Sequence, residues 1–437
     1  MRISVFGCGY LGAVHAVAMT KLGHDVVGID VSESQVQALS QGTPPFYEPD
    51  LADLLKESLD SGRLRFSMDA ADALGAEVHF ICVATPQRKG ENAADLHYVD
   101  AVVGDLLPYV SPGDVVVGKS TVPVGTAERL AERITNTAPD VALVWNPEFL
   151  REGHAVTDTI SPDRFVYGVS ADDAGSAAAA KLDRVYAAAL SEGTPKIVTD
   201  LATAQLVKVA ANSFLATKIS FINAMAELCE ATGADVTELA DAIGHDDRIG
   251  RKFLNAGLGF GGGCLPKDIR AFMARAGELG ADQALTFLRE VDSINMRRRV
   301  RMVDLARQEC GGSIVGRKIA VLGAAFKPGS DDVRDSPALS VAAQMQLQGA
   351  AVRVTDPRAI ENARKKWPDL VFADTVEEAV SDAEIVLLLT EWPEYVAIDP
   401  RALAKQVAVP RILDGRNCLD SAAWREAGWT YRALGRN

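Results

Sequence analysis

The chain has 437 residues, of which 48% are hydrophobic and 24% are charged; this is the composition of an ordinary globular protein and excludes a disordered chain, a coiled coil and a low-complexity array. At roughly 150 residues per domain, the length predicts two or three domains. The formal net charge of −14 argues against binding to nucleic acid or to an anionic membrane surface, because like charges repel, whereas a small anionic substrate stays possible where cationic groups gather locally.

The first thirty residues predict a strand, a glycine turn, a helix and a second strand. Residues 1–7 and 25–30 are short apolar runs, and residues 10–22 between them are rich in alanine and valine. This order is a βαβ unit, which implies a parallel sheet. Further strands alternate with helical patterns, so a doubly wound domain is expected over the first 200 residues or so. These strands are expected at residues 78–83, 115–119, 141–145 and 164–169.

A single long helix is predicted between residues 203 and 233, a stretch without proline or internal glycine. A helix of this length is unusual in a globular domain, and we expect it to join two lobes and to form the spine of a dimer. Helical patterns continue to about residue 310, and a short glycine-bearing stretch follows at residues 311–316.

The last third of the chain repeats the opening order of elements without repeating its sequence. Gly323 directly follows one predicted strand and Asp356 the next, as Gly7 and Asp30 do near the N-terminus. We therefore predict an α/β protein with two Rossmann-like doubly wound domains joined by a long central helix and a helical region. Further strands are expected at residues 383–389 and 411–413. The expected domain boundaries are residues 1–200, 201–310 and 317–437.

The cysteines and the N-terminus give no sign of a metal site or of export. The six cysteines lie far apart in the sequence, so we expect neither a zinc site nor a dense disulfide framework. We expect instead that the protein works in a reducing compartment, the cytoplasm. No apolar run reaches the ~18 residues of a membrane span. Gly7, Gly9 and Gly12 interrupt the apolar N-terminus, which is therefore interpreted as folded protein rather than a signal peptide.

The sequence GCGYLG at residues 7–12 fits the G-x-G-x-x-G pattern and lies between a predicted strand and a predicted helix. Here Gly7 allows the tight turn, Gly9 lets a pyrophosphate approach the backbone, and Gly12 lets the helix pack against the strand. The helix N-terminus offers N–H groups and a positive dipole end to phosphates. Asp30, at the end of the second strand, can accept ribose hydroxyls and would repel a 2′-phosphate. We therefore predict an NAD site, with a glycine turn that holds no ligand as the alternative.

Polar residues follow other predicted strands, at the sheet edge where open α/β sheets bind ligands. Thr85 lies in CVATP and Thr121 in KSTVPVGT; each could border the cofactor or be an ordinary loop hydroxyl. Glu148 and Glu152 lie four residues apart in NPEFLREG, so a helical turn would place both carboxylates on one face. One could activate a water while the other meets the nicotinamide or substrate, and the alternative is a solvated acidic turn.

Lys208 and Asn212 are also four residues apart, among mostly apolar neighbours in the predicted long helix. A lysine on the buried side of a helix is costly without an anionic partner. Such a lysine could stabilise an oxyanion, with Asn212 donating a second hydrogen bond. The spacing alone favours the alternative, a lysine whose ammonium stays in water.

Five glycines lie within the seven residues before Cys264. This density predicts a close approach of the backbone to another group, because glycine otherwise weakens a structure. Pro266 suits the first position of a helix, which would place Cys264 at a helix N-terminus, where the dipole and Lys267 favour a thiolate. Asp268 could act as a local acid or base. We predict a nucleophilic cysteine, the alternative being a small buried hydrophobe.

A hydride-accepting cofactor together with a nucleophilic thiol indicates oxidation at the aldehyde level. The thiol adds to an aldehyde, a hydride leaves the thiohemiacetal, and water cleaves the resulting thioester to an acid. In the ordered set of its motifs, the chain resembles the nucleotide-sugar 6-dehydrogenases, which are the UDP-glucose and GDP-mannose dehydrogenases, over nearly its whole length. The motifs are GCGYLG, CVATP, KSTVPVGT, NPEFLREG, the helix with Lys208 and Asn212, GFGGGCLPKD and GAAFKPGSDDVRDSP.

This resemblance implies two Rossmann-like domains joined by a dimerising helix, and oxidation of a sugar C6 alcohol to a carboxylate in two steps that consume two NAD and one water. It implies an NAD-binding domain at residues 1–200, a dimerisation region with the catalytic cysteine at 201–310, and a nucleotide-sugar (UDP) binding domain at 317–437. The implied partners are the nucleotide sugar and a second copy of the chain, and Arg248 is implied to reach the neighbouring subunit's substrate.

The resemblance also assigns roles to residues at matching positions. Cys264 is implied as the nucleophile, and Lys208 and Asn212 as the groups that stabilise oxyanions. Asp268 is implied as an acid or base beside the thiol. The group that handles water is implied to be Thr121, Glu148 and Glu152, with Glu152 as the base for thioester hydrolysis. The implied NAD contacts are Gly7, Gly9, Tyr10, Leu11, Gly12, Asp30, Gln35, Thr85, Thr121, Glu152, Lys267 and Arg334. The implied substrate contacts are Glu148, Phe149, Leu150, Arg151, Glu152, Lys208, Asn212, Arg248, Phe253, Leu254, Asn255, Ala256, Gly257, Gly261 and Lys327.

Gln35 departs from the family pattern, in which many members carry lysine or arginine at this position, so exclusion of NADP depends more on Asp30. The texture of GGGCLPKDIR and RIGRKFLNAG is more similar to the UDP-glucose branch, which makes UDP-glucose the expected substrate and GDP-mannose, TDP-glucose or a UDP-N-acetylhexosamine the alternatives. A β-hydroxyacid or 6-phosphogluconate-type dehydrogenase shares the helix-linked plan but needs no thiol. A non-catalytic NAD sensor would keep the glycine motif and have no use for Cys264, Lys208 and Asn212 together.

Overall fold

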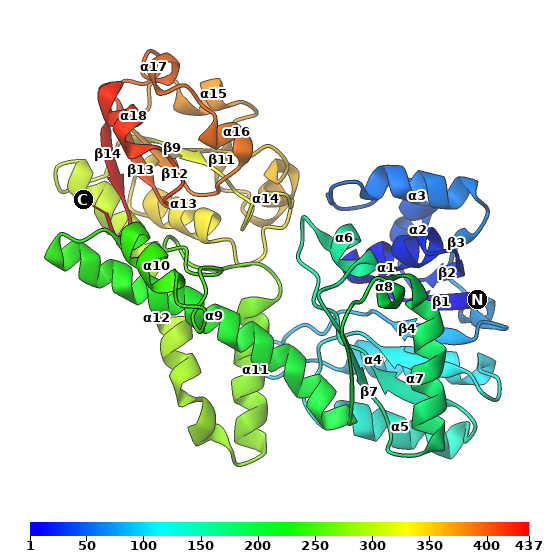
Figure 1. The fold of residues 1–437 in the computed structure, drawn as a ribbon. Helices are drawn as coiled ribbons and strands as arrows, with labels where there is room; N and C mark the ends of the chain where they lie inside the picture. The colour runs from blue at the N-terminus through cyan, green and yellow to red at the C-terminus, as the bar shows by residue number, and fades with distance from the viewer. Residues whose placement is uncertain (437) are drawn as a thin grey trace. The chain divides into compact units, whose positions relative to one another are not determined.

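The computed structural model describes residues 1–436 and shows an α/β protein with two separate sheets and a long helix (Figure 1). The chain divides into two compact units, here called the N-terminal unit (Met1–Ala211 with Arg270–Gly280) and the C-terminal unit (Asn212–Ile269 with Ala281–Asn437). None of the six cysteines, all within the described residues, forms a disulfide. No helix within residues 1–436 combines the length and the apolar character that crossing a bilayer requires.

The N-terminal unit is built on an eight-stranded sheet with the strand order β3-β2-β1-β4-β5-β6-β7-β8. Every predicted strand of this region is present. The expectation of a parallel sheet holds for all neighbours but one, because β6 and β7 are antiparallel and joined at a single pair, Trp145 with Gly168. The strands are β1 (Arg2–Phe6), β2 (Asp25–Ile29), β3 (Leu64–Ser67), β4 (Val78–Ile81), β5 (Val115–Gly118), β6 (Ala142–Trp145), β7 (Phe165–Gly168) and β8 (Lys196–Thr199).

Side chains on the two faces of this sheet form two hydrophobic cores. In β1, Ile3 and Val5 belong to one core and Phe6 to the other, since successive residues of a strand point to opposite faces. All residues of β4 and β5 are buried, as expected for strands covered on both faces. The helices of the unit are α1 (Tyr10–Lys21), α2 (Glu33–Ser40), α3 (Leu51–Asp60), α4 (His97–Leu106), α5 (Thr126–Thr137), α6 (Ala155–Ile160), α7 (Asp173–Val185) and α8 (Ala187–Ser191), with short 3₁₀ helices at Ala70–Ala73 and Leu107–Tyr109.

One continuous helix, α9 (Leu201–Thr232), fills the segment where the long helix was predicted (Figure 1). It has 32 residues, and the boundary between the two units falls within it. An irregular loop between α10 and α11 carries the five glycines and Cys264. The elements that follow α9 are α10 (Val236–Gly244), α11 (Leu265–Glu278), a 3₁₀ helix at Asp282–Leu285 and α12 (Thr286–Glu309).

The C-terminal unit contains a six-stranded parallel sheet with the order β11-β10-β9-β12-β13-β14. This is the 3-2-1-4-5-6 order of the Rossmann fold, which the first six strands of the N-terminal sheet also follow. Its strands are β9 (Lys318–Leu322), β10 (Ala351–Thr355), β11 (Val371–Phe372), β12 (Ile385–Leu388), β13 (Arg411–Asp414) and β14 (Thr430–Ala433). Its helices are α13 (Pro337–Leu347), α14 (Ile360–Lys366), α15 (Val376–Val380), α16 (Pro393–Val396), α17 (Pro400–Leu403) and α18 (Ser421–Glu426).

Candidate active site

The first glycine turn joins β1 to α1 and is tightly packed at two of its three glycines. Gly7 has φ +85°, and a Cβ there would lie 2.6 Å from Cγ1 of Val83. A Cβ at Gly12 would lie 1.7 Å from the carbonyl oxygen of Gly7. Beside Gly9, the N-cap of α1, no atom of the described residues lies within 4 Å of where a Cβ would be. The open side of the turn is therefore at the helix N-terminus, where N–H groups and the dipole favour a pyrophosphate.

Asp30 follows β2 and binds the same turn. Its Oδ2 accepts a hydrogen bond from the backbone N–H of Cys8 (2.6 Å) and its Oδ1 accepts one from Ser32 (2.9 Å). Gln35 donates from Nε2 to the carbonyl of Cys8 (2.8 Å), so at this position the side chain stabilises the turn itself. Because a carboxylate can accept about four hydrogen bonds, Asp30 keeps capacity for ribose hydroxyls.

A buried glutamate that sequence reasoning missed holds the end of loop 146–153. The carboxylate of Glu48 is reached by the hydroxyl of Tyr10 and accepts hydrogen bonds from the backbone N–H groups of Gly153 and Ala155, both at 2.7 Å. Burial, and after it the hydrogen bond to Glu48, raises the pKa of Tyr10. Glu48 thus ties this loop to the first residue of α1, a contact between segments too far apart in sequence to leave a local signal.

The helical turn expected at Glu148 and Glu152 is not formed, because residues 146–151 are irregular and α6 begins after them. Oε2 of Glu148 instead accepts a hydrogen bond from the backbone N–H of Leu150 (2.7 Å), a local bond that competes with helix formation. Its Oε1 lies 2.8 Å from Nζ of Lys208. Lys208 is buried, so the interpretation in which its ammonium stays in water is wrong, and Glu148 is an anionic partner for it.

The neighbouring Phe149 and Glu152 are placed by the same loop. The ring of Phe149 lies 3.9 Å from the Arg164 guanidinium and 5.6 Å from Nζ of Lys208, distances at which cations are attracted to the ring face. Glu152 is buried at the end of the loop. Lys208, Glu148 and Phe149 therefore lie together in the N-terminal unit, as expected if they act on one substrate.

The hydroxyl of Thr85, after β4, donates to the carbonyl of Thr121, after β5, over 2.8 Å. Two residues before Thr121 lies a buried lysine that sequence reasoning did not single out. Lys119 donates to Oδ1 of Asn146 (3.1 Å) and to the hydroxyl of Tyr186 (3.3 Å). Burial lowers the pKa of Lys119 to about 8. A lysine directly after an apolar strand was the available signal for this group.

Cys264 is exposed and immediately precedes α11. Its carbonyl accepts the backbone N–H of Asp268 (2.9 Å), so the helix begins at Leu265, one residue before the start expected from Pro266. An exposed thiol at a helix N-terminus is in the setting that favours a reactive thiolate. The other five cysteines are less exposed, and burial raises the pKa of each of them; they are Cys8, Cys82, Cys229, Cys310 and Cys418.

Asp268, one helical turn after Cys264, is buried and connected to two of the predicted site residues. Its Oδ1 lies 2.7 Å from Nζ of Lys267, and its Oδ2 accepts a hydrogen bond from Nδ2 of Asn212 (2.7 Å). These partners stabilise the charge of a carboxylate that is only 2% exposed. The C-terminal unit therefore brings Asn212, Lys267 and Asp268 together, next to the cysteine in sequence.

The five glycines before Cys264 are required by protein atoms packed against them. A Cβ on each would lie between 2.1 and 2.8 Å from a neighbouring atom of the same unit. The predicted close approach of the backbone is thus present, and the approaching groups belong to the protein. From Gly257 through Gly259, Gly261, Gly262 and Gly263, these groups are the Gly415 carbonyl, Asn295 Oδ1, the Asp335 carbonyl, the Phe326 ring and the Arg334 guanidinium.

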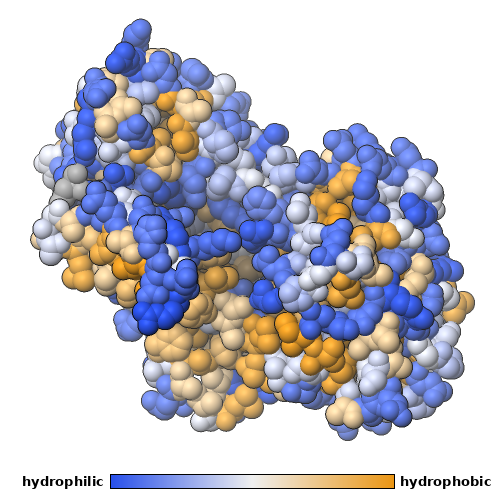
Figure 2. All heavy atoms as spheres, viewed as in Figure 1, coloured by the Kyte–Doolittle hydropathy of each residue, from blue (hydrophilic) through white to orange (hydrophobic). Residues whose placement is uncertain are grey.

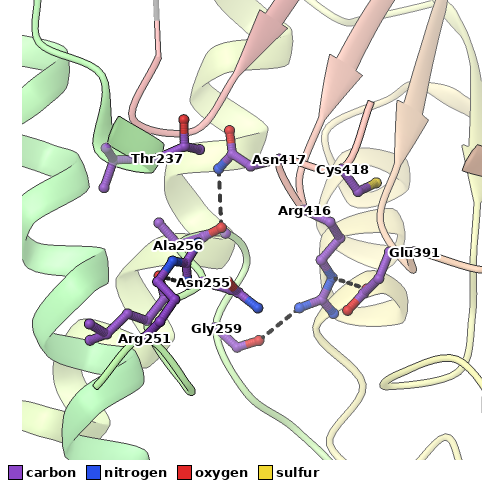
Figure 3. A pocket seen from close by; sticks show the side chains of 12 residues that line it. Thr237, Arg251, Asn255, Ala256, Gly259, Glu391, Arg416, Asn417 and Cys418 are labelled. Atoms are coloured by element: carbon purple, nitrogen blue, oxygen red, sulfur yellow. Dashed lines mark hydrogen bonds and ion pairs between the residues drawn. The ribbon is translucent and has the colours of Figure 1, made fainter. Parts of the chain in front are cut away.

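A pocket in the C-terminal unit is lined by the start of this loop (Figure 3). Arg416, which sequence reasoning missed, donates to the carbonyl of Gly259 (3.1 Å) and pairs with Glu391 (3.2 Å). Arginine recognises phosphate oxygens, so Arg416 is a candidate contact for a phosphorylated ligand in this pocket. Four predicted substrate residues line it, namely Leu254, Asn255, Ala256 and Gly257. The other lining residues are Val236, Thr237, Arg251, Gly259, Glu391, Arg416, Asn417 and Cys418.

Other residues predicted to contact substrate or cofactor lie outside this lining. Phe253 has φ +66° and a half-exposed side chain, and Nζ of Lys327 lies 5.5 Å from the ring of Phe326. Leu11 and Leu150 pack against the core of the N-terminal unit. Three predicted arginines are exposed and paired with nearby aspartates, as Arg151 with Asp158 (2.7 Å), Arg248 with Asp246 (2.6 Å) and Arg334 with Asp332 (2.7 Å).

The second glycine turn, after β9, is closed by its own aspartate. Oδ2 of Asp356 accepts hydrogen bonds from the N–H groups of Ala324 (2.7 Å) and Ala325 (2.9 Å) and from the indole of Trp392 (3.1 Å). Its Oδ1 accepts two more from the backbone of residues 358 and 359. Asp356 is buried and its acceptor positions are occupied, so of the two turns the one at Gly9 suits a dinucleotide.

Comparison with known proteins covers the whole chain. The NAD binding domain, central domain and UDP binding domain of the UDP-glucose/GDP-mannose dehydrogenase family match residues 1–190, 202–297 and 320–421. A UDP-glucose 6-dehydrogenase of Rhizobium meliloti is 42% identical over the full length of both chains, and the enzyme TuaD of Bacillus subtilis is 40% identical over all of this chain and 93% of the relative. A UDP-glucose dehydrogenase structure from Pyrobaculum islandicum, 38% identical, has a TM-score of 0.90 and covers 100% of this chain and 98% of its own.

Proposed function

Since the chain belongs to the UDP-glucose/GDP-mannose dehydrogenase family, we propose that it oxidises the C6 alcohol of UDP-glucose to a carboxylate and so forms UDP-glucuronate. The observation that carries this proposal is a loop of the C-terminal unit. Its start, Leu254 to Gly257, lines a pocket that also holds Arg416, and its end leads into the exposed Cys264. A single segment thus offers groups for a nucleotide and a nucleophile for the sugar.

The residues of the first glycine turn fit NAD, the cofactor of this family. Gly9 leaves room at the N-terminus of α1, and Asp30 can accept ribose hydroxyls while it repels a 2′-phosphate. Tyr10, Leu11 and Gly12 continue the turn into the helix. NAD, when bound, accepts a hydride from the substrate carbon in each of two oxidations.

In the proposed first half of the reaction, the C6 hydroxyl loses its proton to the carboxylate of Asp268 as a hydride leaves C6, which gives an aldehyde. The Cys264 thiolate then adds to the aldehyde carbon and forms a thiohemiacetal. Lys208 and Asn212 donate hydrogen bonds to the oxygen that becomes negative, the kind of stabilisation that usually contributes most to such steps.

In the second half, a second hydride leaves the thiohemiacetal carbon and a thioester on Cys264 remains. Glu152 takes a proton from water, the water oxygen attacks the thioester carbon, and the carbon–sulfur bond breaks. Thr121 and Glu148 help to place that water. The products are the carboxylate and the Cys264 thiol, so each sugar consumes two NAD and one water.

A panel of nucleotide sugars tests the proposal directly. With NAD and UDP-glucose, we expect two NADH per sugar and an acidic product, because both hydrides leave the same carbon. GDP-mannose, TDP-glucose and a UDP-N-acetylhexosamine are the other members of the panel. One NADH per sugar would point to a single-step dehydrogenase, and no NADH with any member would contradict the proposal.

We further propose that the protein acts as a homodimer formed along α9. Phe214, Phe221 and Leu228 lie seven residues apart in α9 and are 67%, 48% and 57% exposed, so they form one apolar stripe along the helix. Figure 2 shows apolar side chains gathered over the region that Figure 1 labels α9 and α12. Replacement of Phe221 by glutamate should shift the mass in sedimentation equilibrium from dimer to monomer, and an unchanged mass would contradict this arrangement.

Arg248 is proposed to reach the substrate of the neighbouring subunit. Its side chain is 89% exposed and forms an ion pair with Asp246, so it lies at the surface. Arg248→Ala should raise the KM for the nucleotide sugar while the dimer stays intact. A cytoplasmic location is also proposed, supported by the need to keep the Cys264 thiol reduced.

A further inference from the structure

The loop Leu254–Gly263 is held from α12 by a fully buried amide. Oδ1 of Asn295 accepts a hydrogen bond from the backbone N–H of Phe260 (2.7 Å), and its Nδ2 donates to the carbonyl of the same residue (3.0 Å). Asn295 is 0% exposed. Both polar atoms of this buried amide therefore bind the backbone of one loop residue, Phe260, which lies four positions before Cys264.

The same contact explains why the residue before Phe260 is glycine. Gly259 has φ +87°, and a Cβ there would lie 2.1 Å from Oδ1 of Asn295. No side chain could occupy this position unless Asn295 moved away. Asn295 can therefore bind Phe260 in this way only because residue 259, 36 positions earlier in the sequence, has no side chain.

A second attachment holds the loop at Gly257, and its two parts come from α9 and α12. The N–H of Gly257 donates to Oδ1 of Asn223 (2.9 Å), and its carbonyl accepts from Nε of Arg298 (3.2 Å). Arg298 is 0% exposed and lies 3.4 Å from Glu230. Arg298 follows Asn295 by three positions, so both lie on one face of α12.

Buried polar side chains in a helix are costly unless they are hydrogen-bonded, and apolar residues would pack α12 at lower cost. The loop, however, has no regular secondary structure, so its backbone N–H and carbonyl groups need partners from elsewhere. Asn223 and Arg298 supply these partners at Gly257, the last residue of the pocket stretch, and Asn295 supplies them at Phe260, between that stretch and Cys264.

We propose that Asn295 is a positioning residue: by binding both polar groups of Phe260, it fixes the loop that carries the nucleotide-sugar contacts and leads into Cys264. The inference rests on the proposed function in one respect, because it takes Leu254–Gly257 to contact the nucleotide. Arg298 and Asn223 fix the start of the same loop.

The test compares Asn295→Leu, which keeps the size of the side chain and removes both hydrogen bonds, with Val303→Ala. Val303 lies on the same helix and is buried in the C-terminal core, so its truncation weakens α12 without touching the loop. The probe is UDP, whose affinity is measured by titration calorimetry alongside that of NAD. If Asn295→Leu fails to fold, the nearly isosteric Asn295→Asp takes its place. This variant keeps the acceptor for the N–H of Phe260 but sets a carboxylate oxygen against the Phe260 carbonyl, and that repulsion should likewise weaken UDP binding.

We expect Asn295→Leu to weaken UDP binding at least about tenfold, because the buried N–H of Phe260 loses its acceptor, and to leave NAD affinity unchanged. The carbonyl keeps a contact of 3.4 Å from Arg299. Val303→Ala should lower Tm with UDP affinity within about twofold of the parent. Parental UDP affinity in Asn295→Leu, or equal losses of UDP affinity in both variants, would overturn the inference. Failure of the parent protein to oxidise any nucleotide sugar would contradict the proposed function and leave this comparison of affinities to decide the role of Asn295.

Discussion

Nζ of Lys208 lies 2.8 Å from Oε1 of Glu148, and the two side chains are only 6% and 14% exposed. The pair joins helix α9 to the loop at residues 146–153, and its two residues are 60 positions apart in the sequence. Both the cation and the anion are largely buried. Such a pair is costly to break from one side, because the remaining charge stays buried without its partner. The proposed oxyanion contact of Lys208 therefore starts from an ammonium that Glu148 already holds in place.

Lys208→Met should reduce kcat by at least about a hundredfold, because it removes the proposed oxyanion contact, and should lower the free energy of unfolding by about 3 kcal/mol. In the double variant Lys208→Met/Glu148→Gln, both charges are gone, so much of the stability should return while the activity does not. Urea unfolding and steady-state rates of all three proteins measure this. Equal stability of the single and the double variant would show that the pair does not hold the loop.

Replacing the buried Lys119 by methionine should raise the free energy of unfolding by an amount that depends on pH. Burial lowers its pKa to about 8, below the ordinary ~10.4, so the folded state bears the cost of a buried ammonium below pH 8 and is relieved of it as pH rises toward 10.4. Lys119→Met should therefore raise the free energy of unfolding at pH 7 by about 2–3 kcal/mol, and this gain should shrink between pH 8 and pH 10.

Urea unfolding at pH 7, 8.5 and 10 measures the difference between Lys119→Met and the parent. The control is Lys56→Met, since Lys56 is exposed on α3 and should give no gain that depends on pH. A gain that stays constant from pH 7 to pH 10, or a loss at pH 7, would show that the Lys119 ammonium is stabilising where it lies.

Replacing Asp30 should change both the affinity for NAD and the preference for NAD over NADP. It accepts hydrogen bonds from Cys8 and Ser32, and its charge opposes a 2′-phosphate. Asp30→Ala should raise the KM for NAD by about 10- to 100-fold, because an acceptor for the turn and for the ribose is lost, and should narrow the preference for NAD over NADP. Asp25→Ala, at the exposed start of β2, is the matched control. Unchanged discrimination between the two cofactors would contradict the role of Asp30.

The fold followed from local patterns in the sequence. The strands at residues 78–83 and 115–119 were predicted from continuous apolar runs, and the structure places β4 and β5 within them. The helix at 203–233 lacked any breaking residue and is α9. The antiparallel junction of β6 and β7 could not be predicted, because the direction of a strand depends on where the chain travels between strands.

The site was predicted less completely, because its geometry depends on contacts over long sequence distances. The partner of Lys208 lies in a loop whose conformation is set by Glu48 and by a side-chain bond of Glu148, and spacing alone suggested a helical turn there. The glycines before Cys264 predicted that the backbone lies close to another group. The sequence could not show that at Gly259 this group is Asn295, because the two residues are brought together only by the fold.

The central claim is that Cys264 holds the sugar carbon covalently between the two oxidations. The most direct measurement is mass spectrometry of Glu152→Gln after acid quench with NAD and UDP-glucose, since slower hydrolysis should let the thioester accumulate. The account predicts an acyl adduct on the peptide that contains Cys264, and predicts that Cys264→Ala shows no adduct and no acid product while it still binds NAD. Acid production by Cys264→Ala, or turnover in Glu152→Gln with no adduct on Cys264 at any quench time, would contradict it.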